Sequence, residues 1–317
     1  MKNNESLNSH FHLALFADIG PIRYLFFSLC LILYMIINCA NVVLILTVCL
    51  EKSLHQPMYV FICCLSFNSL YGSAGLFPRL LMDILSDTHL ISRSSCFIQI
   101  FVLYMYASCE ITILSIMAYD RFVAICQPLH YHSKMTFKVV FRLITFAEVY
   151  PACVCSFCLS LTILLPLCGN KLNRLFCTNW PVVQLSCVDT TVNSIIGVIA
   201  VVMTIFIPLF FILYTYLCIL LVSQRNSSEF RVKALQTCLP HIVTFVNYSL
   251  SFTGELLLNR LKDDEINPFI IVFLSLEFLI IPPIMNPLVY GLKLPQIKTV
   301  IFGFFRMSKR ARRQVDD

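Results

Sequence analysis

The chain has 317 residues, of which 58% are hydrophobic and only 13% are charged. Soluble globular proteins carry about 25% charged residues, so this composition predicts a membrane protein. The net charge of +6 does not indicate a nucleic-acid partner, because most basic residues fall in loops on one side of the predicted topology. Seven apolar segments use up most of the length, which leaves room for one membrane domain between two tails.

Residues 1–21 form the predicted extracellular tail. Charged residues interrupt it, and its one apolar piece is too short for a cleavable signal peptide. Insertion is therefore expected to depend on the first span. Asn4 starts a glycosylation sequon with Glu5 and Ser6, which is usable only if the tail faces the lumen. We expect a glycoprotein with its N-terminus outside.

Seven segments are long and apolar enough to cross a bilayer, because a hydrocarbon core needs about 20 residues of helix. None alternates with the period of two that marks a membrane β-barrel. The predicted spans are Tyr24 to Leu50, Pro57 to Leu85, Cys96 to Cys126, Val139 to Leu165, Val192 to Val222, Lys233 to Leu258 and Pro268 to Leu292. The sequence thus predicts an all-α membrane protein, a seven-helix bundle within residues 22–292.

The basic residues predict the orientation of this bundle. Most Lys and Arg, including Lys134, Arg142 and Arg231, lie in loops that are cytoplasmic if the N-terminus is outside. The acidic residues Asp263 and Asp264 lie in the third outer loop. Positive charge gathers on the cytoplasmic side of membrane proteins, so we expect the N-terminus outside and the C-terminus inside.

Residues 293–317 form the predicted cytoplasmic tail. From Leu294 to Met307, apolar and basic residues follow a pattern typical of a short amphipathic helix on the inner leaflet. The basic run from Lys309 to Arg313 is expected to contact anionic lipid or to act as an export or retention signal.

No motif for covalent chemistry is present. The chain lacks a phosphate-binding loop, His-Glu-x-x-His and Gly-x-Ser-x-Gly, and it has only eight glycines. We expect neither an enzyme nor a cofactor. Cys155 and Cys158 have redox spacing but lie in a predicted span, where they are expected to pack as small apolar residues. His130 and His132 lack a third metal ligand and are interpreted as loop residues.

Polar residues gather instead at the predicted inner ends of the helices, within four motifs. These are LHQPMY at 54–59, MAYDRFVAIC at 117–126, KALQTC at 233–238 followed by His241, and PPIMNPLVYG at 282–291. In this order and on these spans they resemble the signature motifs of vertebrate odorant receptors, within the rhodopsin-like G-protein-coupled receptors. The resemblance covers residues 20–306 and is strongest to fish odorant receptors.

The resemblance implies a conformational switch at the inner ends of the helices. Asp120 would hold Arg121 in the resting state, and outward movement of the sixth helix would free Arg121 toward Tyr216, Tyr290 and a G protein. A charge near hydrocarbon is costly, so a retained ion pair there favours a two-state element. The predicted switch residues are Asp120, Arg121, Tyr216, His241, Asn286 and Tyr290.

Glu110 lies deep in the third span, about three helical turns before Arg121 and on a similar face. An intramembrane carboxylate is a functional-site candidate by default. Similar receptors carry Glu here, and it is expected to face Asn286, Asn68 and Ser69 around a sodium ion or water cluster. We favour a hydrogen-bonded or protonated Glu110, and modulatory cation binding is the alternative.

Four cysteines lie on the predicted outer side, and four permit three pairings. The resemblance selects Cys96 with Cys177 and Cys168 with Cys187. Two bridges would clamp the second outer loop as a lid over a ligand pocket.

The predicted ligand pocket lies between the helices in their outer half. Helical spacing and family position give the lining candidates Ile100, Tyr104, Ala107, Ser108, Gly197, Val201, Thr204, Tyr248, Phe252 and Leu256. Their mixture of aliphatic, phenol and hydroxyl groups predicts a small, partly polar ligand. Arg260 ends the sixth span, where it pairs either with a ligand carboxylate or with Asp263 or Asp264.

The resemblance implies a plasma-membrane receptor in olfactory cilia. It would bind a small, water-soluble odorant and activate a stimulatory olfactory-type G protein by a population shift. A non-olfactory rhodopsin-like receptor is one alternative. A small transporter is another, although transporters usually contain internal repeats and this chain shows none.

Overall fold

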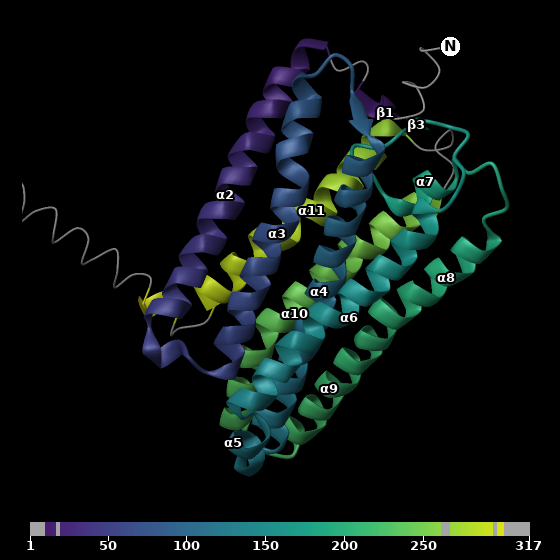
Figure 1. Cartoon of the computed structure of the whole chain (residues 1–317). Coiled ribbons are helices and arrows are strands. Elements are labelled where there is room, and N and C mark those ends of the chain that lie inside the picture. The colour runs from purple at the N-terminus through teal and green to yellow at the C-terminus, as the bar shows by residue number, and fades with distance from the viewer. Residues whose placement is uncertain (1–9, 17–19, 261–266, 294–296, 301–317) are drawn as a thin grey trace, which may run out of the picture.

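The computed structural model describes residues 10–16, 20–260, 267–293 and 297–300. In this part of the chain, seven long helical rods run side by side, and three short strands lie at one end (Figure 1). Six rods are α2 (Arg23–Leu50), α3 (Pro57–Leu85), α4 (Arg93–Cys126), α6 (Phe137–Ile163), α10 (Ser228–Arg260) and α11 (Pro268–Lys293). The seventh rod joins α8 (Thr191–Val201), the π-helical turn η5 (Val202–Phe206) and α9 (Ile207–Gln224).

The predicted spans lie close to these helices. The second predicted span coincides with α3, where Pro57 occupies the first turn that favours proline. Six rods are long and apolar enough to cross a membrane by length and composition. The remaining rod, α10, carries more polar residues, and it packs against α11, α4 and α9.

Short helical elements precede the first rod or connect one rod to the next. They are η1 (Ala14–Phe16), η2 (Gly20–Ile22), η3 (Lys52–Leu54), η4 (Pro128–His130), α5 (Tyr131–Lys134) and α7 (Asn179–Val183). Residues 297–300 are helical, whereas the rest of the predicted amphipathic helix lies outside the described residues. The predicted glycosylation site Asn4 and the acidic residues Asp263 and Asp264 also lie outside them.

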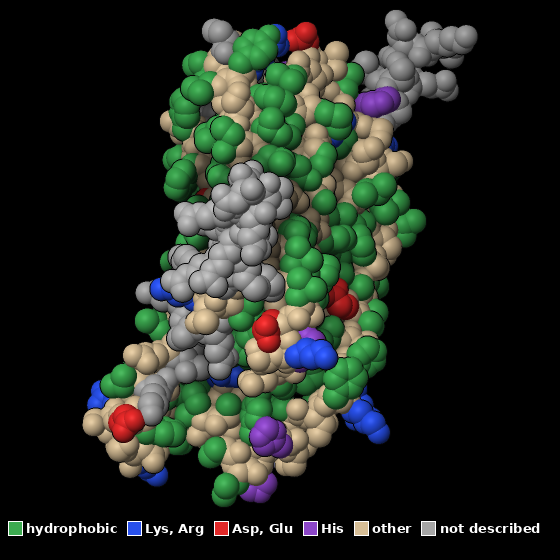
Figure 2. Space-filling model, turned by 90° about the vertical axis from the view of Figure 1, so that its left-hand side faces the viewer, with side chains coloured by type: hydrophobic (Ala, Val, Ile, Leu, Met, Phe, Trp, Pro, Cys, Tyr) green, Lys and Arg blue, Asp and Glu red, His purple; other side chains and the backbone are tan. Residues whose placement is uncertain are grey.

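The outside of the bundle is apolar. Leu25, Ile32 and Leu46 on α2 and Phe210 on α9 are among many exposed large hydrophobic side chains. Figure 2 shows hydrophobic side chains over most of the described surface of one face, with charged groups mainly at its upper end and in its lower half. Water-soluble monomers rarely expose apolar surface on this scale, so this surface suits contact with lipid.

Helix α4 lies inside the bundle and packs against α3, α6, α9 and α10. Its contact with α3 depends on two small residues. A Cβ atom added to Gly72 would lie 2.5 Å from the Tyr106 ring, and one added to Gly75 would lie 2.2 Å from Val102. These glycines therefore permit the close approach of the two helices.

A buried asparagine compensates for the prolines of α11. The carbonyl of Pro283 has no helical donor at position 287, because Pro287 lacks an N–H group. The fully buried Asn41 of α2 donates a hydrogen bond to this carbonyl at 3.0 Å. The bond satisfies a backbone group in the membrane core and fastens α2 to α11.

The N-terminal segment forms a strand that the sequence analysis did not predict. Strand β1 (His10–Leu13) lies between β2 (Leu90–Ser92), which is antiparallel to it, and β3 (Lys171–Leu172), which is parallel. Phe11 and Leu13 of β1 are fully buried. The sheet therefore joins the N-terminal tail to the first and second outer loops.

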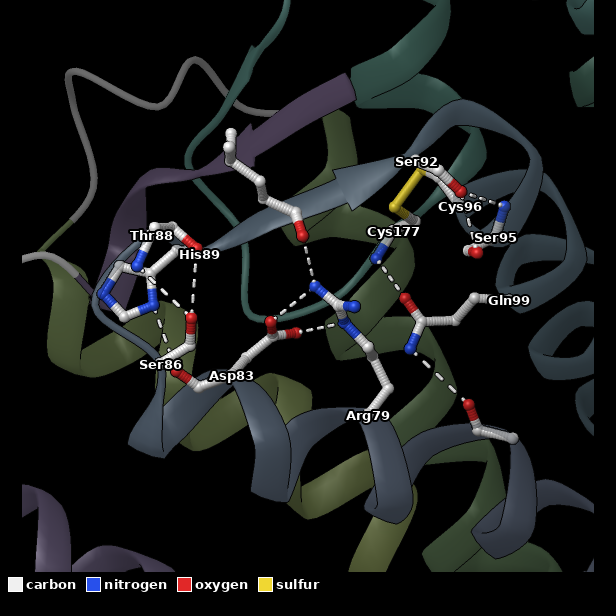
Figure 3. A network of polar contacts seen from close by, with 12 residues as sticks. Arg79, Asp83, Ser86, Thr88, His89, Ser92, Ser95, Cys96, Gln99 and Cys177 are labelled. Atoms are coloured by element: carbon white, nitrogen blue, oxygen red, sulfur yellow. Dashed lines mark hydrogen bonds and ion pairs between the residues drawn. A yellow bond between two sulfur atoms is a disulfide. The ribbon is translucent and has the colours of Figure 1, made fainter. Parts of the chain in front are cut away.

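Both predicted disulfides are present, Cys96–Cys177 and Cys168–Cys187. Beneath the first bridge, the Gln99 side chain accepts a hydrogen bond from the Cys177 backbone N–H at 2.9 Å (Figure 3). The second outer loop is thus fixed to α4 by a covalent bond and a buried hydrogen bond.

A salt bridge on α3 supports the same end of the bundle. Arg79 donates to both carboxylate oxygens of Asp83, at 2.8 and 2.6 Å, and to the β2 carbonyl of Leu90 at 2.6 Å (Figure 3). The Asp83 side chain is 2% exposed, and that of Arg79 is 29% exposed. The Arg79 guanidinium thus connects α3 to the sheet.

We predict that Asp83→Asn lowers the stability of the purified protein in detergent. Breaking a buried pair costs about 3–5 kcal/mol, and because Arg79 is partly exposed, solvent screening lowers the expected loss to about 2–3 kcal/mol. The matched control is Asp87→Asn, because the Asp87 side chain pairs with Arg23 but is 86% exposed. Thermal unfolding should separate the two variants, and equal losses would contradict the role assigned to Asp83.

Candidate functional site

The outer half of the bundle contains a cavity of about 90 Å³. Its wall is mostly apolar and comes from α4, α6, α7, α8, η5 and α10. Of the predicted ligand residues, the lining includes Ile100, Tyr104, Ser108, Gly197, Val201, Thr204, Phe252, Leu256 and Arg260. Nine of the residues that helical spacing and family position predicted therefore surround a single cavity in the structure.

The other two predicted ligand residues lie elsewhere. Ala107 lines a second cavity of about 20 Å³. Tyr248 lines neither cavity, because its hydroxyl donates to the Ala107 carbonyl at 2.5 Å and its ring stacks on Phe252. The structure corrects its predicted place in the lining: Tyr248 connects α10 to α4.

Arg260 stands at the outer end of the larger cavity. Its guanidinium lies 4.1 Å from the centre of the Trp180 ring, and it donates to the Ser194 hydroxyl at 3.2 Å. Both of these partners are neutral, and the Trp180 ring makes a cation–π contact with the guanidinium. The ring holds the guanidinium beside the cavity.

The polar side chains in the wall include Asn179 of α7 and Asn259 of α10. Asn179 accepts a hydrogen bond from Thr162 at 2.8 Å, and Asn259 accepts one from Thr178 at 2.9 Å. These bonds fasten the lid to α6 and α10. Asn259 and Trp180 were not among the predicted residues. Trp180 reaches the cavity because the lid folds over the bundle, and the bond from Thr178 of the lid is what the structure adds for Asn259 of α10.

The sequence analysis also missed Glu255, which lines the smaller cavity and is 5% exposed. A carboxylate within a predicted span was itself a sufficient signal. Its position on the inner face of α10 is what the structure adds.

Glu110 is fully buried at the middle of α4. One carboxylate oxygen accepts from the Asn68 amide at 2.8 Å and the other from the Asn286 amide at 2.6 Å. Two of the three predicted neighbours thus meet Glu110. Ser69 does not, because its hydroxyl donates to the Leu65 carbonyl of its own helix at 3.0 Å.

At the inner end of α4, the Arg121 guanidinium donates to the Asp120 carboxylate, with one bond at 2.9 Å. Asp120 is fully buried. His241 and Tyr290 form a second pair, with 3.2 Å between the ring nitrogen and the hydroxyl. Tyr216 is buried on α9 and forms no hydrogen bond to Arg121 among the described residues. Asn286 belongs to the Glu110 network and not to this end.

Tyr131 is an additional partner of the Asp120–Arg121 pair that the sequence analysis did not predict. Its hydroxyl donates to the second oxygen of Asp120 at 2.8 Å. Burial and, after it, the Asp120 charge raise the pKa of Tyr131 above its usual range, so the hydroxyl keeps its proton and can donate. The second inner loop thereby helps to hold Asp120.

The family model described as olfactory receptor matches residues 29–307. The chain belongs to the olfactory receptor family. Olfactory receptor 51L1 of Homo sapiens is 33% identical over 288 residues, which cover 87% of this receptor and 88% of that relative. Olfactory receptor 4E2 of Mus musculus is 35% identical over 287 residues, which cover 90% and 91%.

The fold agrees with this membership. Squid rhodopsin superposes with a TM-score of 0.74 over 93% of this receptor and 86% of that chain, at 17% sequence identity. The predicted seven-helix fold is thereby confirmed. The receptor is a multi-pass membrane protein and not an enzyme, and its family implies a small-molecule ligand and a G protein as partners. The transporter alternative is excluded.

We predict that Tyr131→Phe raises basal signalling of the receptor, because it removes one hydrogen bond from the resting Asp120–Arg121 pair. A loss of about 1 kcal/mol from one of two states shifts their ratio by about fivefold. The matched control is Tyr119→Phe, since the Tyr119 hydroxyl forms no hydrogen bond among the described residues. Basal second-messenger level, normalised to surface receptor, is the measurement. An equal rise in both variants would contradict the assignment.

Proposed function

We propose that this receptor detects a small, water-soluble odorant at the plasma membrane of sensory cilia. Binding in the outer cavity activates a stimulatory, olfactory-type G protein at the inner face. The N-terminus lies outside and the C-terminus inside.

The outer cavity is the observation that carries this proposal. It is enclosed by apolar side chains with a few polar groups, which is the usual composition of a ligand pocket. Its volume of about 90 Å³ is well below the roughly 300–1,000 Å³ of pockets for drug-sized molecules. This size favours a ligand of few heavy atoms, as expected for an odorant.

Helix α10 supports transmission from this cavity to the cytoplasmic side. Phe252 and Leu256 line the cavity near its outer end, and His241 contacts Tyr290 farther inward on the same helix. Because Phe252, Leu256 and His241 lie on one continuous helix, a ligand that shifts the outer part of α10 can also act on the contact between His241 and Tyr290 of α11. The output is a change in the populations of two helix arrangements.

The disulfides support the proposed orientation. Such bridges persist in oxidising compartments, and Cys96–Cys177 lies beside the sheet that contains β1 (Figure 3). The end of the bundle that holds the N-terminal strand therefore suits the extracellular side. The excess of basic residues in the opposite loops agrees with this assignment.

An odorant panel tests the proposal. Cells that express the receptor with a stimulatory G protein should show a cyclic-nucleotide rise with at least one small, water-soluble odorant. If carboxylic acids are among the active odorants, Arg260→Ala should raise their half-maximal concentration about tenfold, as expected for a lost charge-assisted hydrogen bond. Lys171→Ala is the control, because Lys171 is exposed on β3 and lines neither cavity. A current or flux that needs no G protein would contradict the proposal.

We further propose that Glu110 and Asn286 form a modulatory sodium site. The Asn286 side-chain oxygen is buried and has no hydrogen-bond partner in the part of the chain that the structure describes, and oxygen ligands suit hard cations. Glu110→Gln removes the negative charge. It also replaces one acceptor oxygen by an NH2 group, which then faces the NH2 group of Asn68 or Asn286. We expect it to abolish the sodium dependence of signalling and to change basal activity. Glu148→Gln is the control, because Glu148 lies on α6 outside this network. Unchanged sodium dependence and basal activity in Glu110→Gln would remove Glu110 from this role.

A further inference from the structure

Glu255 is a buried acid at the wall of a cavity. It lies on α10 and is 5% exposed. The smaller outer cavity that it lines shares Tyr104, Phe252, Leu256 and Asn259 with the larger one. Because the two cavities have these walls in common, a ligand in the larger cavity lies next to the space that Glu255 borders.

The direct hydrogen bonds to Glu255 come from neutral groups. One carboxylate oxygen accepts from the Asn259 amide at 3.0 Å, and the other accepts from the Ser275 hydroxyl of α11 at 3.2 Å. A carboxylate offers about four acceptor positions. These two bonds leave capacity for further donors on a side chain that lines the cavity.

No ion pair within the described residues involves Glu255. The Arg174 guanidinium is near enough to act on it electrostatically, but its hydrogen bonds include the backbone carbonyls of Asn173 and Leu258. The groups that bond directly to Glu255 are therefore neutral, and a buried carboxylate is stabilised by a positive group in direct contact. A cationic ligand group would supply this contact only when bound, which favours ligand recognition at this position.

A second acid in the same helix pair has a different environment. Glu277 of α11 accepts from the Ser251 hydroxyl of α10 at 2.5 Å, whereas Ser275 of α11 donates to Glu255 of α10. The two serine–carboxylate contacts thus cross the α10–α11 interface in opposite directions. Glu277 lines neither outer cavity. Glu255 and Glu277 thus have the same side chain and lie in the same helix pair, and they differ in that only Glu255 lines an outer cavity.

We propose that Glu255 binds the protonated amine of the receptor's ligand. This inference rests on the proposed function, because it assigns a ligand class to the same outer site. The small volumes of the two cavities favour a short amine. The ammonium group belongs either to a simple alkylamine or to an α-amino acid, whose carboxylate would then be available to Arg260.

Four probes that share a butyl chain, two of them with an added carboxyl group, test this proposal in cells with the cyclic-nucleotide readout. They are n-butylamine, L-norvaline, pentanoic acid and n-butanol. We expect the wild-type receptor to respond to n-butylamine or L-norvaline, and Glu255→Gln to raise the half-maximal concentration of the active amine at least tenfold. Loss of the L-norvaline response alone in Arg260→Ala identifies an amino acid as the ligand class.

Glu277→Gln is the matched control and should keep the amine response, with surface receptor measured for every variant. An equal amine response in Glu255→Gln and wild type overturns the proposal, and so does a wild-type receptor that no short alkylamine or amino acid activates. In that second outcome, responses to acids, alcohols or other odorants leave the odorant-receptor function intact. A panel without any active odorant counts against the function itself.

A binding measurement covers the outcome in which Glu255→Gln does not reach the surface. The purified full-length wild-type receptor and Glu277→Gln should gain thermal stability from n-butylamine hydrochloride or L-norvaline, and not from n-butanol at the same concentration. Equal stabilisation by the amine and the alcohol overturns the proposal, since a carboxylate site must distinguish an ammonium group from a hydroxyl.

Discussion

The carboxylate of Glu110 holds three helices together at the centre of the bundle. A polar group in hydrocarbon must find its partners inside the protein, and each oxygen of Glu110 finds one amide, from α3 and from α11. Asn41 extends this arrangement to α2 through the Pro283 carbonyl. Sliding any of these helices by one turn would leave a buried polar group without its partner, so the contacts fix the register of four rods.

Helix α10 is attached to its neighbours in a different way. Its polar contacts include single hydrogen bonds from Tyr248 to Ala107, between His241 and Tyr290, and across the two serine–carboxylate pairs. Each of these bonds joins α10 to one neighbour only, whereas the Glu110 carboxylate is shared by three helices. The bundle thus combines a group of helices that share one buried acid with a helix that is held by separate hydrogen bonds.

The sequence predicted the rods because a membrane helix must be a long apolar run, and such a run is visible without knowledge of its neighbours. It also placed Glu110 opposite Asn68 and Asn286, since intramembrane polar residues have few possible partners. The β1 strand was not predicted, because four residues acquire a strand conformation only through pairing with two distant loops. Tyr248 was wrongly placed in the cavity wall for a similar reason. Helical spacing predicts which face of the helix a residue occupies, but it does not predict that the Tyr248 hydroxyl donates to the Ala107 carbonyl. Tyr131 looked like an ordinary loop residue until the fold brought it to Asp120.

The small outer sheet also sets an order of events during biosynthesis. His12 of β1 pairs with Lys171 of β3, and four membrane spans lie between them in the chain. The N-terminal segment is synthesised first and meets β2 after two spans, but its pairing with β3 must wait until the second outer loop has been translocated and Cys177 has become available to Cys96. Closure of the sheet is therefore a late step that requires the first four spans to be in place. A receptor with a complete sheet has therefore assembled its first four spans correctly. In a receptor with unpaired β1, Phe11 would be exposed as an apolar side chain of the kind that chaperones bind.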